Sequence, residues 1–228
     1  RLLQHWRHSN FNGPRPFYCQ VEAVETVIWL TEVARGKRQY ASLFRGLEQA
    51  NLEANPELFR LALKLATGAG KTTVMAMLIA WQAINHARQP GSSLFSRGFL
   101  IVTPGITIKD RLRVLLPSDP ENYYRERELV PPDLMNDLNK AKIVITNYHA
   151  FKQRETLDTN KVGRAALSGW RNETLVTKET EGEMLQRACG ELLSIRNIVV
   201  LNDEAHHCYR ERAGTAEEQD LRGEEKNE

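Results

Sequence analysis

The sequence predicts an α/β domain in three layers, with a mostly parallel central sheet between helices. Three apolar runs of strand length, at residues 98–103, 141–146 and 197–201, alternate with segments of helical periodicity. Strands separated by helices favour parallel pairing through right-handed crossovers. A chain of 228 residues with 41% hydrophobic residues is also long enough for one large domain with a full core.

The first 57 residues are expected to form an N-terminal helical region. Val21, Val24 and Ile28 repeat at helical spacing, which predicts a helix over residues 21–33 that ends before Gly36. Residues 40–56 mix polar and apolar side chains and are expected to hold one short helix.

Residues 58–210 are expected to form the main domain. A strand is expected at residues 59–65, followed by a glycine-rich turn and a helix over residues 71–87. A Gln-Pro-Gly sequence at 89–91 breaks that helix, and the buried strand at 98–103 follows. After the next Pro-Gly turn, the chain is expected to return as a helix over residues 108–115.

Two C-terminal segments depart from this alternation. Residues 152–190 are largely polar with weak periodicity, which indicates an insertion in the main domain, and the polar stretch is expected to precede a helix near residues 183–193. Residues 211–228 are charged and nearly free of apolar side chains, so this tail is expected to be disordered.

The composition of the chain indicates where the protein is found and gives little information on its function. The net charge of +2 is nearly neutral, so any nucleic-acid surface would have to be a local basic patch. No apolar run reaches the roughly 20 residues that span a bilayer, which argues against a membrane partner. Cys19, Cys189 and Cys208 are isolated, and such sparse cysteines are typical of the reducing cytoplasm.

The strongest functional signal is a glycine-rich turn that opens a helix. Gly68 and Gly70 allow a tight turn with backbone N–H groups directed at phosphate oxygens, and the helix adds its positive N-terminus. Lys71 can then reach the β- and γ-phosphates, and the Thr72 hydroxyl can ligate Mg²⁺. Leu65 stands where the strict eight-residue pattern has glycine, and the alternative is an ordinary glycine turn. The predicted ATP-binding residues are Thr67, Gly68, Ala69, Gly70, Lys71, Thr72 and Thr73.

An acidic pair follows the last predicted strand. Asp203 can hold Mg²⁺, and Glu204 can orient and deprotonate an attacking water. The alternative is a surface pair that caps the next helix. His206 is expected to couple this site to a neighbouring segment, because contiguous His-His-Cys ligands rarely close around one zinc ion. Together with the glycine loop, the pair predicts ATP hydrolysis, with Lys71, Glu204 and His206 as the catalytic residues.

These motifs resemble those of superfamily 2 helicases and translocases of the DEAH-box type. Their amino-acid sequences are most similar to those of the helicase subunit of type III restriction enzymes, with motif-like stretches at 65–72, 100–105, 145–151 and 203–208. The resemblance covers almost the whole chain and implies a RecA-like P-loop NTPase fold. It also implies that Gln20, which follows Arg15-Pro16, reads the adenine edge; the alternative is a solvated residue at a helix start.

The resemblance implies a nucleic-acid face at the ends of two strands. Hydroxyl and backbone groups there can bind phosphates without reading bases, while the alternative is plain turn and helix-cap chemistry. Nearby Lys109, Arg111 and Arg113 could add positive charge or form a solvated helix face. The residues expected on this face are Thr103, Pro104, Gly105, Thr146 and Asn147.

The resemblance further implies partners outside these motifs. A motif III and a second RecA-like domain are expected downstream, so the chain is interpreted as the first motor domain of a larger DNA translocase, and its motifs as half of a catalytic cleft. A modification or specificity subunit is a possible further partner. An RNA helicase and a nucleotide-gated binding module remain alternatives. A P-loop kinase or transferase is disfavoured, because Glu204 beside Asp203 favours water as the nucleophile.

Overall fold

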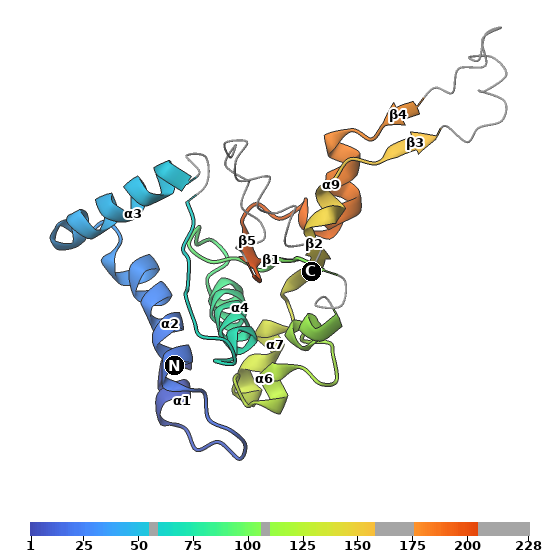
Figure 1. Ribbon diagram of the computed structural model, residues 1–228. Helices are drawn as coiled ribbons and strands as arrows, with labels where there is room; N and C mark the ends of the chain where they lie inside the picture. Colours follow the sequence, from blue (N-terminus) through green and yellow to red (C-terminus); the bar gives the residue numbers. More distant parts are fainter. Residues whose placement is uncertain (55–58, 106–109, 158–175, 205–228) are drawn as a thin grey trace, which may run out of the picture.

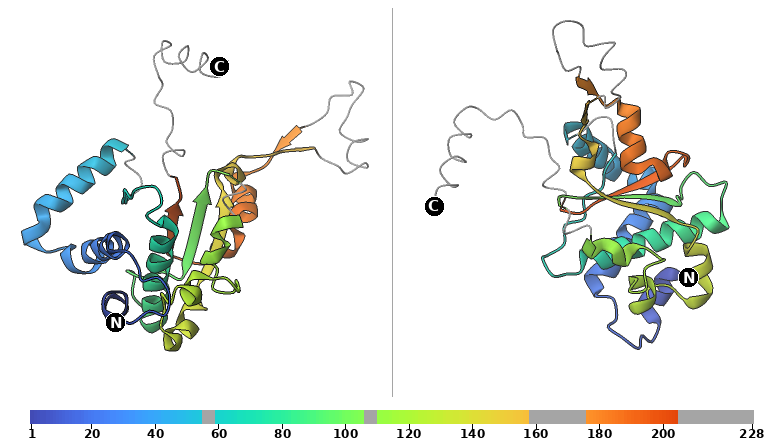
Figure 2. Two further views of the ribbon diagram at one scale, coloured as in Figure 1. Left: turned by 60° about the horizontal axis from the view of Figure 1, so that its bottom comes forward. Right: turned by 90° about the vertical axis from the view of Figure 1, so that its right-hand side faces the viewer.

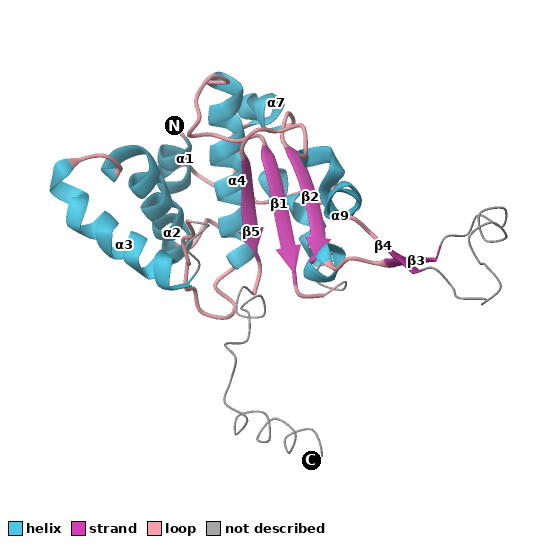
Figure 3. Cartoon of the chain, turned by 90° about the horizontal axis from the view of Figure 1, so that it is seen from above, coloured by secondary structure: helices cyan, strands magenta, loops and turns pink. Residues whose placement is uncertain are grey.

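The computed structural model describes residues 1–54, 59–105, 110–157 and 176–204 (Figure 1). Within these residues the main sheet has the order β2-β1-β5, with both pairs parallel. β1 (Gly98–Thr103), β2 (Lys142–Asn147) and β5 (Ile198–Asn202) therefore present their carboxyl ends at one edge (Figure 3). The predicted α/β class and its parallel sheet are confirmed, and the three predicted runs match the three strands to within a residue or two.

The other described elements are helices, short turns and a small second sheet. They are α1 (Leu2–His8), α2 (Tyr18–Ile28), η1 (Trp29–Ala34), η2 (Arg38–Tyr40), α3 (Ala41–Ala54), α4 (Lys71–Arg88), η3 (Leu112–Leu115), α6 (Tyr123–Glu126), η4 (Pro132–Leu134), α7 (Met135–Leu138), η5 (Tyr148–Phe151), β3 (Glu155–Leu157), β4 (Val176–Lys178), α9 (Glu181–Cys189) and η6 (Gly190–Leu192). None of the helices in the described part of the chain is long and apolar enough to cross a membrane.

The two faces of the sheet are covered by different helices. Phe99 and Ile101 of β1 belong to the large core built around α4, while Leu100 and Val102 pack with Cys189 and Leu192 on the other face. Successive side chains of a strand point to opposite faces, so β1 is buried on both. This double burial explains its continuous apolar run.

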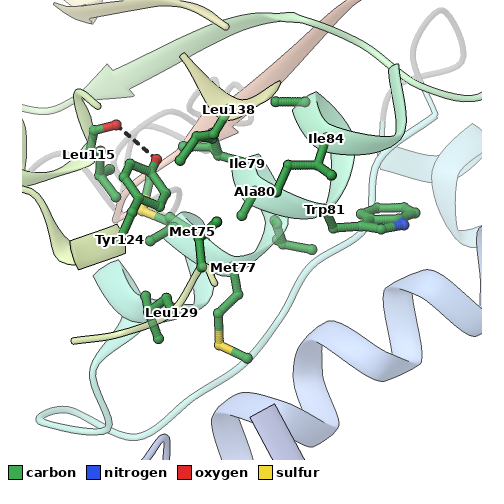
Figure 4. Packing of buried hydrophobic residues seen from close by; sticks show 14 of the residues in the cluster. Met75, Met77, Ile79, Ala80, Trp81, Ile84, Leu115, Tyr124, Leu129 and Leu138 are labelled. Carbon is green, nitrogen blue, oxygen red and sulfur yellow. Dashed lines mark hydrogen bonds between the residues drawn. The ribbon is translucent and has the colours of Figure 1, made fainter. Parts of the chain in front are cut away.

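The segment after β1 completes the main core, although no sequence pattern predicted this role. Tyr124 of α6 is fully buried and its hydroxyl donates to the Leu115 carbonyl over 2.8 Å (Figure 4). Burial raises the pKa of the Tyr124 phenol. Leu129 and Leu138 from the same segment lie among the side chains of α4 (Figure 4). The helix predicted over residues 108–115 is a 3₁₀ turn over its last four residues, and residues 106–109 lie outside the described part.

The strand predicted at residues 59–65 is wrong for the described structure. Leu63 and Leu65 pack against the core, but Phe59 and Leu61 are 53% and 37% exposed. The Asn51 side chain of α3 forms hydrogen bonds with both backbone polar groups of Arg60. Its Oδ1 accepts from the Arg60 nitrogen over 2.7 Å, and its Nδ2 donates to the Arg60 oxygen over 3.0 Å. A helix side chain thus replaces the neighbouring strand that the prediction required.

The described N-terminal residues are helical, and the second helix is longer than predicted, while a separate N-terminal region stays a prediction. α2 continues through η1, and the chain turns at Gly36 with a left-handed φ of 78°. The expected short helix is α3, which has 14 residues and lies on the far side of α2 from the sheet (Figures 1 and 3).

β3 and β4 form a short arm that projects from the end of the sheet (Figure 2). β3 and β4 pair antiparallel there. At its base, Arg187 donates to the Glu179 carboxylate over 2.8 Å and to the Lys152 carbonyl over 3.2 Å. The hydrogen bond with Arg187 lowers the pKa of Glu179 to about 2. The helix predicted near residues 183–193 is α9 followed by η6. The predicted disordered tail, 211–228, lies outside the described residues.

Candidate nucleotide site

The glycine loop leads directly into α4, as the sequence predicted. Gly68 and Gly70 adopt left-handed φ angles of 81° and 76°, and Gly70 is the residue from which the helix starts. The Thr73 nitrogen donates to the Gly70 oxygen over 2.9 Å and closes the first turn. The first N–H groups of a helix have no intrahelical acceptor and carry its positive dipole. The loop therefore ends in a helix terminus of the kind that suits an anion.

Gln20 supports this loop from α2. It is only 3% exposed, so the alternative of a solvated helix-start residue is wrong. Its Nε2 donates to the Ala69 oxygen over 2.8 Å, and its Oε1 accepts from the Phe17 nitrogen over 2.9 Å. One side chain thus connects the N-terminal region with the glycine loop. Whether Gln20 also contacts adenine stays a prediction.

Lys71 and Glu204 meet although they are 133 positions apart. The Lys71 Nζ lies 2.6 Å from the Glu204 Oε1, and the side chains are 35% and 33% exposed. The hydrogen bond to Glu204 raises the pKa of Lys71, so the ammonium charge is retained at neutral pH. Glu204 has a left-handed φ of 52°, which is uncommon for a residue other than glycine. Such conformations are often held at functional sites.

Asp203 lies beside this pair at the end of β5. Its nitrogen donates to the Val102 oxygen over 3.0 Å, which continues the β1–β5 ladder by one residue. Burial, followed by the charge of Glu204, raises the pKa of the Asp203 carboxyl. A cation near Asp203 would favour its charged form. Carboxylate and hydroxyl oxygens are suitable Mg²⁺ ligands, so Asp203 and Thr72 fit the predicted metal by their chemistry. Among the described residues no group of three or more His, Cys, Asp or Glu side chains could hold a metal ion.

The residues expected on the nucleic-acid face lie at the carboxyl edge of β1 and β2, where they also serve the fold. Thr103 is fully buried and its hydroxyl donates to the Gly105 oxygen over 2.9 Å. Thr146 is also buried, and the Asn147 Oδ1 accepts from the Ala150 nitrogen over 3.0 Å as the cap of η5. Turn and cap chemistry is therefore present, and phosphate contact by the remaining backbone groups stays a prediction.

The structure describes two of the three basic residues that were expected near the nucleic-acid face. Arg113 pairs with Asp119 over 3.1 Å, which favours its interpretation as part of a solvated surface. The charge of Arg111 reaches Asp203 and lowers the pKa of that carboxyl slightly against the effect of burial. Lys109 and His206 lie outside the described residues.

Sequence reasoning missed two residues close to the loop. The Arg127 Nη1 donates to the Thr73 hydroxyl over 2.8 Å, and the guanidinium lies 3.7 Å from the centre of the Tyr123 ring. Both residues line a cavity of about 720 Å³ that Gln20 and Thr73 also border. The only local signal was a cluster of aromatic and basic residues at 123–127, which has no motif spacing.

The two loop glycines allow a matched test of this geometry. Alanine at either position should cost about 1–2 kcal/mol of folding free energy, because both have a left-handed φ. A Cβ at Gly70 would also collide with the Gln20 amide nitrogen, whereas a Cβ at Gly68 meets open space. We expect Gly70→Ala to cost about 1–3 kcal/mol more than Gly68→Ala, as overpacking does. Urea unfolding of both variants measures the difference, and equal costs would show that Gln20 does not restrain the loop.

The chain is a parallel α/β domain in which a glycine loop and its lysine face a pair of carboxylates. These features are typical of the P-loop NTPase class. Over residues 14–221 the chain matches the family model of the type III restriction enzyme res subunit, and it belongs to that family. The chain is accordingly a first RecA-like domain of the superfamily 2 helicase type, an ATP-dependent helicase-type motor domain. No curated protein and no solved structure matches the chain.

Proposed function

We propose that this domain binds Mg²⁺–ATP at the glycine loop and hydrolyses it to drive a protein along DNA. The observation that carries the proposal is the contact of 2.6 Å between Lys71 and Glu204. It brings a phosphate-binding cation and a base for water to one point, although they come from α4 and from the end of β5. The family supports the motor class, and the choice of DNA rests on the likeness to restriction enzymes.

Each residue then has a separate task in the proposed reaction. The ammonium of Lys71 leaves Glu204 for the β- and γ-phosphate oxygens, and the loop N–H groups bind the same phosphates. Thr72 and Asp203 would hold Mg²⁺, which neutralises charge on the phosphates when bound. Glu204, released by Lys71, accepts a proton from water as the water oxygen attacks the γ-phosphorus. The bond from the γ-phosphorus to the bridging oxygen breaks, which yields ADP and phosphate.

Further components complete the proposed motor. A second RecA-like domain would supply arginine to the γ-phosphate, and such an arginine can raise the rate by about 10³–10⁵. DNA phosphates would lie along the edge formed by Thr103, Pro104, Gly105, Thr146 and Asn147, and His206 would couple the two sites. A modification or specificity subunit and a cytoplasmic location belong to the same proposal. The isolated domain should then bind nucleotide and turn it over slowly.

ATPase assays on the protein that carries both motor domains test the proposal, with no polymer, double-stranded DNA, single-stranded DNA or RNA added. We expect turnover to rise with DNA and to vanish in Lys71→Ala, while Lys64→Ala, which alters an exposed lysine seven residues earlier, stays near wild type. Stimulation by RNA alone would favour the RNA helicase. Turnover without response to any polymer would overturn the motor, and nucleotide binding without turnover would favour a gated binding module.

A further inference from the structure

A cavity of about 720 Å³ lies beside the first turn of α4. Its border includes Phe17 and Gln20 from the N-terminal region, Thr73 from α4, and Tyr123 and Arg127 from the segment after β1. Pockets of this size bind small molecules or parts of cofactors. Since the cavity shares Gln20 and Thr73 with the surroundings of the glycine loop, a ligand held by its phosphates at the loop could extend its other end into it.

The far wall of the cavity is held in place by contacts within the protein. The Arg127 guanidinium is held between the Thr73 hydroxyl, at 2.8 Å, and the Tyr123 ring, at 3.7 Å. The next residue, Glu128, is fixed as well: its carboxylate accepts from the Asn12 side chain over 2.6 Å and from the Asn12 nitrogen over 2.7 Å. Side chains held by such contacts lose less entropy when a ligand binds.

The chemistry of this wall matches a flat aromatic ligand. A guanidinium plane and a tyrosine ring both stack on nucleobases, and the guanidinium adds a charge that attracts a π-face. Phe17, which is 57% exposed, adds a second aromatic surface at the border of the cavity. Both polar atoms of the Gln20 amide already have protein partners, at Ala69 and Phe17. Each of these two atoms keeps the capacity for one more hydrogen bond, so a base at this site can contact both Gln20 and the aromatic and guanidinium groups of the wall.

We propose that Tyr123 and Arg127 form the wall that recognises the nucleobase of the bound nucleoside triphosphate. The inference rests on the proposed function, because it assumes that the triphosphate occupies the glycine loop. Arg127 also acts as a positioning residue, because its bond to Thr73 connects the base wall with the first turn of α4. Occupation of the wall by a base then stabilises the helix terminus that binds the phosphates.

Comparing ATP with inorganic tripolyphosphate separates base recognition from phosphate binding. Tripolyphosphate can occupy the glycine loop and has no base to stack. We expect Tyr123→Ala to raise the Kd for Mg²⁺–ATP by about 10- to 100-fold, the range that one base–aromatic contact supports, with less than a twofold change for Mg²⁺–tripolyphosphate. Arg127→Met should weaken ATP more than tripolyphosphate, because it removes stacking charge and the Thr73 contact together.

Calorimetric titration of the 228-residue chain measures both ligands, with Arg125→Met and Tyr18→Ala as controls. Arg125 is exposed on the same short helix as Tyr123, Tyr18 is 78% exposed next to Phe17, and neither lines the cavity. Thermal melts verify that each variant folds, and Tyr123→Phe, which keeps the ring, should bind ATP like the wild type. An equal loss for both ligands in Tyr123→Ala would assign the wall a purely structural role and overturn the inference.

The wild-type titrations also distinguish this inference from the proposed function. If the wild type binds both ligands, and Lys71→Ala abolishes both, the glycine-loop site stands. Unchanged ATP affinity in the two wall variants would then overturn the base wall alone. If the wild type binds neither ligand, or if Lys71→Ala leaves both unchanged, the nucleotide site itself is refuted.

Discussion

Glu204→Gln is expected to lower ATP turnover by about 10²–10⁴-fold in the protein that carries both motor domains, which is the usual contribution of a general base. Glutamine has the shape of glutamate and can still lie beside Lys71, but it cannot accept a proton from water. Binding of Mg²⁺–ATP should be retained, because the variant removes a charge that competes with phosphate for the Lys71 ammonium, 2.6 Å away. Steady-state kcat and an equilibrium Kd for ATP separate the two effects.

The control for this variant is Glu191→Gln. Glu191 is an exposed glutamate on η6, and its replacement should leave kcat within twofold of the wild type. Undiminished turnover in Glu204→Gln would remove the residue from its assigned role as the base. A loss of ATP affinity without a loss of kcat would instead make the 204 side chain a binding group.

Tyr124→Ala is expected to cost about 3–5 kcal/mol of folding free energy, as other large-to-small aromatic changes in cores do. Tyr124 is fully buried among α4 side chains, and its hydroxyl bonds the Leu115 carbonyl over 2.8 Å. Tyr124→Phe keeps the ring and leaves that buried carbonyl without its donor, so it should cost about 1–3 kcal/mol. Urea unfolding at equilibrium, with the slope m checked for constancy, measures both variants.

Tyr18→Ala is the matched surface control, because this tyrosine is 78% exposed. Its effect should stay within about 0.5 kcal/mol of zero. If Tyr124→Ala cost no more than Tyr18→Ala, the segment after β1 would not belong to the cooperative core. The base wall at Tyr123 and Arg127 would then lack rigid support from the core.

The predictions that succeeded depend on local signals. β1 lies where its apolar run indicated, because burial on both faces of a parallel sheet leaves almost no polar position in the strand. α4 starts at the residue that follows Gly70, because a glycine with a left-handed φ can end a turn and begin a helix. Lys71 and Glu204 were assigned to one site by the chemistry of their motifs, although the strand expected before the glycine loop is absent from the described structure.

The predictions that failed depend on pairing at a distance. The alternating apolar residues at 59–65 are compatible with a strand, but a strand also needs a neighbour for its backbone, and Asn51 supplies those hydrogen bonds to Arg60 instead. No described residue pairs with the outer edge of β5, and Val200 on that strand is 46% exposed. The role of Tyr124 was missed as well, because its burial depends on the position of α4, about 50 residues earlier in the chain.

The sequence by itself determined the class of the domain, the glycine loop and the acidic pair, because each is encoded by neighbouring residues whose spacing sets the backbone. The tertiary structure alone decided how these parts are supported. It placed Gln20 under the loop, Glu204 within 2.6 Å of Lys71, and Arg127 on the hydroxyl of Thr73. Contacts between residues about 50 to 130 positions apart leave no periodic signature in a single sequence, because they arise only when the sheet and its helices have packed.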